Sequence, residues 1–380
     1  MAHSILRLGL VGGGPGSFIG PVHRMAACLD ARFTLVAGAF SRDLAKSRIQ
    51  AEAWGLSPER AYNGIETMLA GERAREDGIQ AVAIATPNAS HFAIAKAALA
   101  AGVPVICDKP MTATLAEAEL LAPIVAASGQ PFVLTYTYTG YAMVREARAR
   151  IADGAIGRVR KIVVDYPQGW LASPIEASNT QANWRTDPAR AGQGGAIGDI
   201  GVHAFQLAEY VSGLRATELI ADLPRVVAGR RLDDDCNILL RFEGGVPGVL
   251  TASQIAAGER NGLRLRIYGE KGGIEWDHDV PGKLTLRWPD ARSEILHSGG
   301  PGLHPTAERA TRLPAGHPEG FIEAFATLYA GFADAVVGKD DDVDGLLPGI
   351  SDGLRSMRFI DVAVRSNEAR AWLPFPEDRP

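Results

Sequence analysis

The stretch Leu8-Gly9-Leu10-Val11-Gly12-Gly13-Gly14-Pro15-Gly16-Ser17-Phe18-Ile19-Gly20 decides the fold of this chain. It begins with a short apolar run, which is typical of a buried strand. Glycines follow at once and allow the backbone to turn tightly. The next segment, Val22–Leu29, has the composition of a helix. The N-terminal region is therefore predicted to be a strand, a glycine-rich turn and a helix.

The same alternation continues to about residue 136. The predicted strands are Leu8–Val11, Phe33–Ala37, Ala81–Ala85, Val103–Ile106 and Phe132–Thr135. The helical segments between them are Val22–Leu29, Leu44–Trp54, His91–Ala101 and Leu115–Ala127. Repeated strand and helix units predict a right-handed, doubly wound parallel sheet. Asn88 is expected to cap the helix at His91, and Thr114 with Glu117 forms a capping box before Leu115.

Beyond about residue 155 the pattern is that of short strands joined by glycine-containing turns. The predicted strands are Val159–Asp165, Glu218–Val226, Asn237–Phe242, Gly248–Ile255, Leu263–Tyr268 and Gly273–Trp276. Leu263, Leu265 and Ile267 alternate with arginines, which indicates an antiparallel strand with one buried face. Helices are expected at Ala196–Val211, Phe321–Val337 and Gly349–Ser366, with an ordered loop or lid at the surface at Ser298–Gly320.

The 380 residues are enough for two domains. We expect an α/β protein with an N-terminal Rossmann domain at residues 1–138. The second domain, at residues 139–380, is predicted to be α+β with a large, mostly antiparallel open sheet. The last helices are expected to pack back near the first domain.

Composition excludes several functional classes. The net charge of −5 provides no basic surface for nucleic acid, and Arg145–Arg150 is interpreted as the solvated side of a helix. No apolar run is long enough to span a membrane, and no export signal is visible. Cys28, Cys107 and Cys236 lack metal-ligand spacing, which favours a reducing compartment and no metal site. We therefore expect a cytoplasmic protein.

The glycine turn after the first strand predicts a dinucleotide site. Glycines let the backbone approach a pyrophosphate, and the helix N-terminus offers free N–H groups. Gly14 and Gly20 are six residues apart, whereas the usual fingerprint places these glycines three apart. The expected cofactor contacts in this turn are Gly12, Gly14, Gly16, Phe18 and Ile19.

The end of the second strand bears on the choice between NAD and NADP. An acid there binds the ribose hydroxyl of NAD, but Phe40 and Ser41 occupy its expected place and Asp43 comes late. Ser41 and Arg42 are suited to a 2′-phosphate, which favours NADP. Alternatively, Arg42 stacks over the adenine, which is compatible with NAD. Further cofactor contacts are expected at Thr86, Asn88, His91, Asp108 and Lys109.

Two short motifs carry proton-handling groups. Asp108-Lys109-Pro110 follows a strand of the parallel sheet, where a lysine can exchange a proton with a substrate oxygen. Asp199 and His203 are four residues apart, a spacing that puts both on one helix face. We expect Lys109 and His203 to meet beside the bound cofactor. The alternative for Lys109 is an ordinary lysine in a surface loop. The alternative for Asp199 and His203 is a carboxylate at the start of a helix and a histidine in the core. Metal binding is not indicated, because these two residues are only two ligands.

Weaker substrate contacts are expected from aromatic and basic residues of the second domain. Trp184 is expected to flank the nicotinamide or a sugar, and Arg185 to donate hydrogen bonds to hydroxyl groups. The alternative is a core tryptophan and a surface arginine. His317, before Pro318, is either a loop residue or a ligand contact. His23 follows the glycine turn and is a further candidate. Tyr138 is the substrate contact expected from the tyrosines at 136, 138 and 141.

These motifs, in this order, resemble the Gfo/Idh/MocA family of oxidoreductases over essentially the whole chain. The resemblance implies that Lys109 and His203 are catalytic and that Asp199 orients the substrate or the imidazole. It also implies a homodimer or homotetramer formed through the open sheet. Asp108 stands where the family more often has glutamate, and the family's Asn/Arg motif is not evident around Tyr138–Tyr141.

The long glycine turn and His317-Pro318-Glu319-Gly320 resemble a subgroup acting on sugars or inositols. Several members use NAD, so the cofactor is left as NAD or NADP. The expected reaction transfers a hydride between the nicotinamide and a C–OH of a sugar, anhydrosugar or cyclic polyol. Lys109 or His203 takes the hydroxyl proton. The alternatives are a non-catalytic sugar or dinucleotide sensor and redox-assisted glycoside cleavage.

Overall fold

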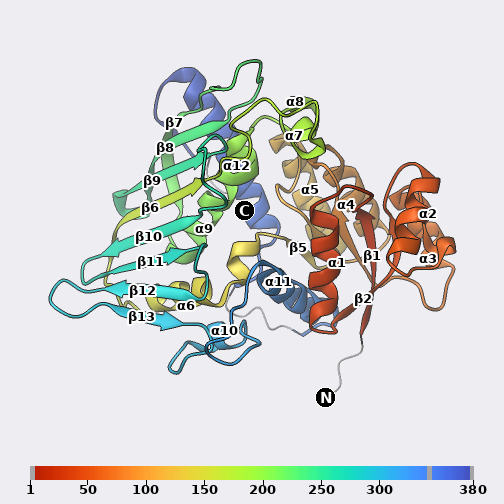
Figure 1. Ribbon diagram of the computed structural model, residues 1–380, viewed down its shortest axis with the longest axis horizontal. Helices are drawn as coiled ribbons and strands as arrows, with labels where there is room; N and C mark the ends of the chain where they lie inside the picture. Colours follow the sequence, from red (N-terminus) through yellow and green to blue (C-terminus); the bar gives the residue numbers. More distant parts are fainter. Residues whose placement is uncertain (1–4, 340–344, 377–380) are drawn as a thin grey trace. The chain divides into compact units, whose positions relative to one another are not determined.

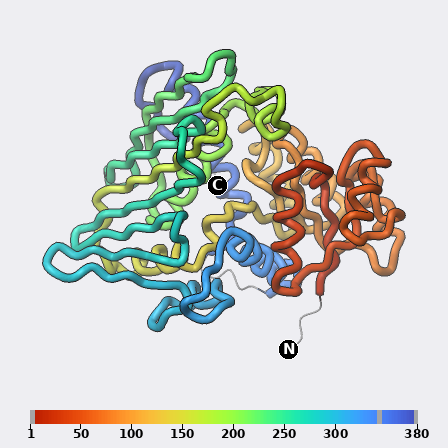
Figure 2. Tube along the Cα trace, in the orientation of Figure 1, coloured from red at the N-terminus to blue at the C-terminus, as the bar shows by residue number. Residues whose placement is uncertain are grey.

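The computed structural model describes residues 5–339 and 345–376. It contains two compact units. Figure 1 and the Cα trace in Figure 2 are coloured by position in the sequence, so the segments of each unit can be followed by residue number. The first unit is Met1–Thr137 with Phe321–Leu354, and the second is Tyr138–Gly320 with Arg355–Pro380. The predicted α/β class, with a parallel sheet and a mostly antiparallel one, is confirmed.

The first unit is built on a parallel sheet with strand order β2-β1-β3-β4-β5. Its strands are β1 (Leu6–Gly12), β2 (Phe33–Ala39), β3 (Ala81–Ala85), β4 (Val105–Cys107) and β5 (Phe132–Leu134). Because all strands are parallel, their carboxyl ends lie at one edge. In this order the connections diverge between β1 and β3, which is where such sheets bind ligands.

The first unit also contains helices, and not all of them were predicted from the sequence. They are α1 (Ile19–Leu29), α2 (Leu44–Ala53), α3 (Ile65–Arg73), α4 (His91–Ala100), α5 (Leu115–Ser128) and α11 (Phe321–Val336), with 3-10 turns η1 (Pro58–Arg60) and η2 (Asn88–Ser90). Helix α3 was not predicted. The capping box of Thr114 and Glu117 at the start of α5 is confirmed. The predicted cap at Asn88 is wrong, because Ser90 occupies the N-cap position of α4 and makes no side-chain cap.

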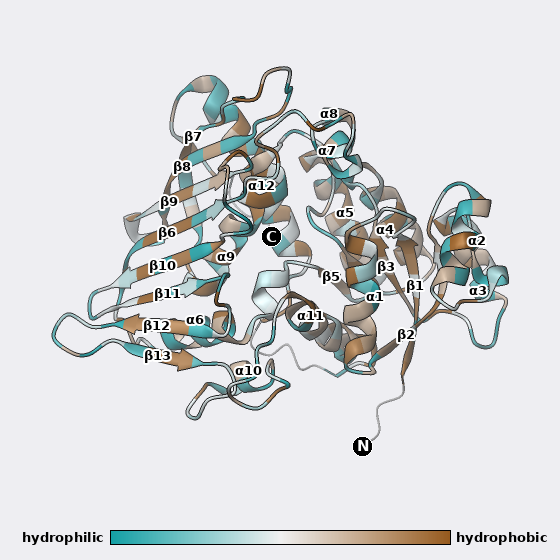
Figure 3. Cartoon of the chain, viewed as in Figure 1, coloured by the Kyte–Doolittle hydropathy of each residue, from teal (hydrophilic) through white to brown (hydrophobic). Residues whose placement is uncertain are grey.

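The core of the first unit joins segments far apart in the sequence. Helix α11 packs on α1, and its Phe332 ring stacks on Phe33 with centroids 5.6 Å apart. Leu8 and Leu10 of β1 are almost fully buried in the same core. Figure 3 shows β1 in the brown of apolar residues. Burial on both faces explains why these strands lack a polar alternation.

The second unit is built on a larger sheet with strand order β13-β12-β11-β10-β6-β9-β8-β7-β14. Its strands are β6 (Val159–Pro167), β7 (Ala216–Asp222), β8 (Asp235–Phe242), β9 (Val246–Ser253), β10 (Arg264–Gly269), β11 (Gly273–Asp277), β12 (Lys283–Arg287), β13 (Glu294–His297) and β14 (Leu373–Pro374). Strands β6 and β9 pair in parallel, while their other neighbours are antiparallel. Strands β12, β13 and β14 were not predicted.

The helices of the second unit include α6 (Ala142–Ala152) and α9 (Val202–Ser212), which pack on each other and on the sheet. The others are α7 (Thr180–Arg185), α8 (Pro188–Ala191), α10 (Pro305–Glu308) and most of α12 (Ile350–Ala369), with 3-10 turns η3 (Thr137–Gly140) and η5 (Glu243–Gly245). Helix α10 interrupts the predicted loop at Ser298–Gly320. None of the described helices is both long and apolar enough to cross a membrane.

Two sequence predictions for this unit are wrong. Arg145 does not lie on a solvated helix face: it is buried, and its Nε donates to the carbonyl of Thr139 at 3.0 Å. The expected helix at Ala196–Val211 does not begin as an α-helix. Its first turn is the π-helical turn η4 (Ile197–Gly201), which runs into α9. Such turns are often found at functional sites.

Candidate functional site

The glycine turn of the first unit has the geometry of a phosphate cradle. A Cβ on Gly12 would lie 2.3 Å from the carbonyl oxygen of Ala85, and one on Gly14 would lie 2.5 Å from that of Phe40. A Cβ on Gly20 would lie 2.2 Å from the Cα of Gly13. Gly20 is therefore the glycine that lets the helix pack closely on the strand, and the extra residues lie before it. Gly16 has a φ of 81° and open space where a Cβ would stand.

The N-terminus of α1 follows this turn and is suited to an anion. Phe18 occupies the N-cap position, is 60% exposed and makes no side-chain cap. The N–H of Gly20 donates to Ser17 Oγ at 3.2 Å. The first turn of α1, which is described in full, carries no acidic residue. Close backbone approach and an uncompensated positive helix end fit the pyrophosphate of a dinucleotide.

The residues after β2 are arranged around the start of α2. Asp43 is its N-cap, and one carboxylate oxygen accepts the N–H of Ala45 at 2.9 Å and of Lys46 at 3.4 Å. Ser41 Oγ accepts the N–H of Asp43 at 3.2 Å, and Arg42 is exposed. The late position of Asp43 is thus explained by a capping role.

The ends of β3 and β4 are tied together by His91. This histidine is fully buried, and its Nε2 lies 2.8 Å from the carbonyl oxygen of Thr86 while its Nδ1 lies 2.9 Å from that of Pro110. Asp108 accepts the N–H of Lys109 and the hydroxyl of Thr135, each at 2.9 Å. These contacts hold the backbone on both sides of Lys109 at the ligand edge of the sheet.

His23 is also buried behind the glycine turn. It has no exposed surface, and its Nδ1 lies 2.7 Å from the hydroxyl of Tyr329 on α11. Burial lowers the pKa of His23 from 6.5 to about 4, although the nearby Asp108 carboxylate opposes that change. The imidazole is therefore neutral near pH 7 and part of the core.

In the second unit, Asp199 lies in η4 and His203 in α9. One carboxylate oxygen of Asp199 accepts Arg185 Nε at 3.1 Å and Gln254 Nε2 at 2.9 Å. The ring of His203 stands edge-on to Tyr138, with centroids 5.0 Å apart. Asp199 is therefore a paired anion, and the imidazole faces an aromatic side chain.

Trp184 and Arg185 lie in this same cluster. Arg185 Nη1 donates to Gln181 Oε1 at 2.6 Å, and the guanidinium lies 4.3 Å from the Trp184 ring centroid. The same guanidinium lies 6.0 Å from the Trp170 ring centroid. The structure thus brings together Trp184, Arg185 and Asp199. His317, in contrast, is an exposed loop residue whose Nδ1 lies 3.1 Å from the carbonyl oxygen of Pro314.

Tyr138 belongs to a buried hydrogen-bond network. Its hydroxyl contacts that of Tyr166, which donates to Asn261 Oδ1 at 2.7 Å. Burial raises the pKa of Tyr138 to about 12, so this phenol stays protonated at neutral pH. His278 Nε2 lies 3.0 Å from the Tyr141 hydroxyl, and burial lowers its pKa. The network therefore offers neutral donors and acceptors.

Sequence reasoning missed several residues of this cluster. They are Tyr166, Gln168, Trp170, Gln181, Gln254, Asn261 and His278. A signal existed for Gln168 and Gln254, because they follow β6 and β9. Since these two strands pair in parallel, the residues after them lie at the same sheet edge. Among the described residues, no group of three or more His, Cys, Asp or Glu could hold a metal ion.

Comparison with known proteins gives matches to both units. Residues 6–136 match the model of an oxidoreductase family with an NAD-binding Rossmann fold, and residues 144–275 match the GFO/IDH/MocA C-terminal domain. An uncharacterized oxidoreductase of Bacillus subtilis, YfiI, is 36% identical, with 97% of each chain covered. Levoglucosan dehydrogenase of Pseudarthrobacter phenanthrenivorans is 28% identical, with 98% of each chain covered.

A solved structure gives the same result. The inositol dehydrogenase homolog of Azotobacter vinelandii, complexed with NAD+, has a TM-score of 0.94 and 36% identity, with 98% of each chain covered. A structure of an inositol dehydrogenase homolog from the same organism, complexed with NADH and myo-inositol, has a TM-score of 0.89 and 35% identity, with 98% of each chain covered. The first unit is thus an NAD-binding Rossmann domain. Its cradle at Gly12, Gly14 and Gly20 fits that cofactor. The chain belongs to the Gfo/Idh/MocA family of oxidoreductases.

Proposed function

We propose that this protein is an NAD-dependent dehydrogenase of a sugar, anhydrosugar or inositol-type polyol. The observation that carries the proposal is the polar and aromatic cluster around Asp199 and His203. Arg185 and Gln254 hold the Asp199 carboxylate there, and His203 lies beside Tyr138. Lys109 supplies a second proton-handling group from the NAD-binding unit.

The chemistry of the cluster supports an uncharged, polyhydroxylated ring as substrate. Arg185 and Asp199 neutralise each other, so the pair does not select for a charged group. Trp170 and Trp184 bring aromatic rings, which suit the C–H groups of such a substrate, beside the Arg185 guanidinium. Gln181 and Gln254 hold the polar side chains of the cluster in place, through Arg185 and Asp199. Two relatives named above act on, or are homologs of enzymes acting on, such rings.

We assign the residue roles as follows. Bound NAD supplies the hydride acceptor at its nicotinamide C4. As the substrate C–H hydride leaves, the hydroxyl on the same carbon must lose its proton, and this leaves a carbonyl group. Lys109 Nζ and the His203 imidazole are the two groups proposed to receive that proton. Asp199 orients the substrate hydroxyls or the imidazole.

The test is turnover of a panel of inositols, aldoses and anhydrosugars with NAD, followed by nicotinamide absorbance. Lys109→Ala is expected to lower kcat by about 10²-fold or more, the usual contribution of an acid–base group, with NAD affinity mostly retained. Lys96→Ala, an exposed lysine on α4, is the matched control. Near-wild-type turnover in Lys109→Ala would refute the assignment.

His203→Ala separates the two proton acceptors. If His203 receives the proton directly, the variant loses the low-pH limb of the kcat profile together with most of its rate. If Lys109 is the acceptor, that limb remains in the His203 variant. An unchanged rate would make His203 structural.

The same panel separates two alternatives. Redox-assisted glycoside cleavage gives product with no net change in nicotinamide absorbance. A sensor protein binds the sugar or the dinucleotide without turnover. In that case, substitution of Lys109 or His203 changes only the affinity for these ligands. Net NADH formation in proportion to ketone product supports the dehydrogenase.

We also propose that the larger sheet forms a homodimer or homotetramer interface. Leu239 of β8, Tyr268 of β10 and Ile295 of β13 are 48%, 43% and 57% exposed. Leu239→Lys is expected to lower the molar mass measured by light scattering, and an unchanged mass would argue against this face.

The three cysteines are free thiols, which fits the proposed reducing, cytoplasmic compartment.

A further inference from the structure

Asp233, two residues before β8, holds the start of the turn that carries Asp199. Its two carboxylate oxygens accept the N–H of Gly195 at 2.7 Å and of Ile197 at 2.8 Å. Its main-chain carbonyl accepts the intervening N–H of Ala196 at 2.9 Å. Three consecutive N–H groups, which a helix start leaves without intrahelical partners, therefore end on one residue.

The fit between Asp233 and this turn is close. A Cβ on Gly195 would lie 2.0 Å from the Asp233 carbonyl oxygen, so only glycine lets the two backbones meet. The carbonyl of Gly195 then accepts the N–H of Asp199 at 2.9 Å, the hydrogen bond that opens η4. The position of Asp199 thus follows from that of Asp233 through two hydrogen bonds.

The same segment also positions the partner of Asp199. The main-chain carbonyl of Asp234 accepts the N–H of Gln254 at 2.9 Å. The side chain of Gln254 then donates to Asp199 at 2.9 Å. A closed chain of contacts runs from Asp233 through η4 to Asp199, on to Gln254, and back to Asp234.

We propose that Asp233 is a positioning residue, which fixes Asp199 and His203 for the reaction without touching the substrate. This rests on the proposed function. Burial raises the pKa of Asp233 to about 6, although the two backbone N–H groups oppose that change. The N–H groups of the turn donate to both carboxylate oxygens, and these hydrogen bonds offset the cost of burying the group.

The test compares Asp233→Asn with Asp234→Asn. The asparagine at 233 keeps one acceptor oxygen but turns an amide N–H₂ toward a backbone N–H donor. Asp234 is the control: it is also buried, and its carboxylate accepts the N–H groups of Val226 and Val227, each at 2.8 Å, and Arg230 Nη1 at 3.2 Å. Only its main-chain carbonyl, which the substitution keeps, contacts Gln254. Gly195→Ala is the second variant, used if Asp233→Asn fails to fold. Its Cβ would push the backbone of Gly195 away from the carbonyl oxygen of Asp233.

The readout is the single-turnover rate of hydride transfer per bound NAD, together with the NAD dissociation constant and thermal unfolding. Asp233→Asn is expected to lower the rate at least about tenfold, with NAD affinity unchanged and a larger deuterium isotope effect. Asp234→Asn is expected to keep the wild-type rate.

The outcomes separate this inference from the proposed function. If the wild-type protein forms no NADH with any member of the panel, the proposed function fails. If His203→Ala loses turnover while Asp233→Asn keeps it, only the positioning role of Asp233 fails. Equal losses in the two asparagine variants, in step with lower thermal stability, would make Asp233 merely structural and would also overturn the inference.

Discussion

The two buried histidines of the NAD-binding unit differ in their partners, and this sets their roles. His91 has a carbonyl oxygen at each ring nitrogen. His23 has the Tyr329 hydroxyl at Nδ1 and an apolar surround that includes the edge-on ring of Phe325, 4.9 Å away. His91 therefore fixes two loops at the ligand edge, whereas His23 contributes to the core as a neutral ring.

The lowered pKa of His23 predicts acid sensitivity. Its pKa is about 4 in the folded chain and 6.5 in the unfolded one, so between these values the unfolded state binds more protons. Folding stability is lost as pH falls through this window, by about 3 kcal/mol at most. We expect the free energy of unfolding of His23→Asn, measured with urea, to fall less than that of the wild type between pH 7 and pH 4. His317→Asn, an exposed histidine, is the control, and parallel pH curves for His23→Asn and wild type would contradict the prediction.

His91→Phe is predicted to act on Lys109 from a distance. The substitution removes the contacts of His91 with the carbonyl oxygens of Thr86 and Pro110, while keeping an aromatic ring at this position. If Lys109 receives the proton, as proposed, kcat is expected to fall at least about tenfold when it is misplaced, with the KM of the proposed substrate changed much less. His91→Gln, which retains one donor, is expected to recover part of the rate. A rate equal to wild type in His91→Phe would show that Lys109 is held by other contacts.

Among the elements, those with strong local patterns were predictable and those set by tertiary contacts were not. The strand Ala81–Ala85 and the α5 capping box were predicted to the residue. The contacts of Ile197–Gly201 could not be read from its own sequence, because the N–H groups at its start bind Asp233, more than thirty residues away. Strand β14 has two residues and exists only through its pairing with β7.

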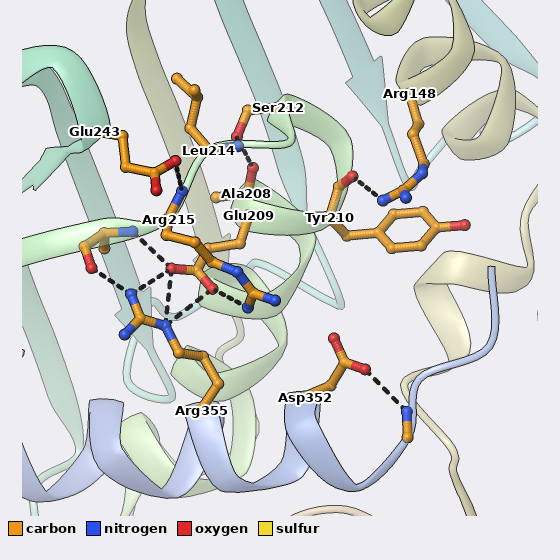
Figure 4. A network of polar contacts seen from close by, with 12 residues as sticks. Arg148, Ala208, Glu209, Tyr210, Ser212, Leu214, Arg215, Glu243, Asp352 and Arg355 are labelled. Atoms are coloured by element: carbon orange, nitrogen blue, oxygen red, sulfur yellow. Dashed lines mark hydrogen bonds and ion pairs between the residues drawn. The ribbon is translucent and has the colours of Figure 1, made fainter. Parts of the chain in front are cut away.

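Helix α12 is predicted to depend on one buried ion pair. Arg355 donates to Glu209 of α9 at 2.8 Å, and Glu209 also accepts Arg215 and the N–H of Ala216 (Figure 4). Removing one partner leaves a buried charge, so Glu209→Ala is expected to lower the free energy of unfolding by about 3 kcal/mol. Asp361→Ala breaks the more exposed pair with Arg365 on the same helix and is expected to change it by less than about 1 kcal/mol. Chemical denaturation measures both, and similar losses would contradict the prediction.

At the scale of the whole molecule, the sequence predicted the glycine turn of the NAD-binding domain from one local stretch, whereas the residues of the proposed substrate cluster come from several separate segments. The glycine turn was recognisable because backbone chemistry alone dictates it. Tyr166, Asn261 and Gln254 were missed because they come together only when β6, β9 and the turn before β10 are folded. The cofactor signature of the chain is therefore local, whereas the proposed substrate cluster forms only in tertiary structure.

This difference predicts how ligands stabilise the protein. NAD bound to the folded chain raises the free energy of unfolding by about 2.7 kcal/mol at a hundredfold excess over its dissociation constant. Gly14→Val is expected to abolish the NAD-dependent rise in melting temperature, because its side chain would collide with the Phe40 carbonyl. Gly64→Ala is the control, since Gly64 has extended backbone with a φ of −175° and a more distant neighbour. A full NAD shift in Gly14→Val would place the cofactor elsewhere, whereas its loss there and retention in Gly64→Ala would tie binding to the cradle.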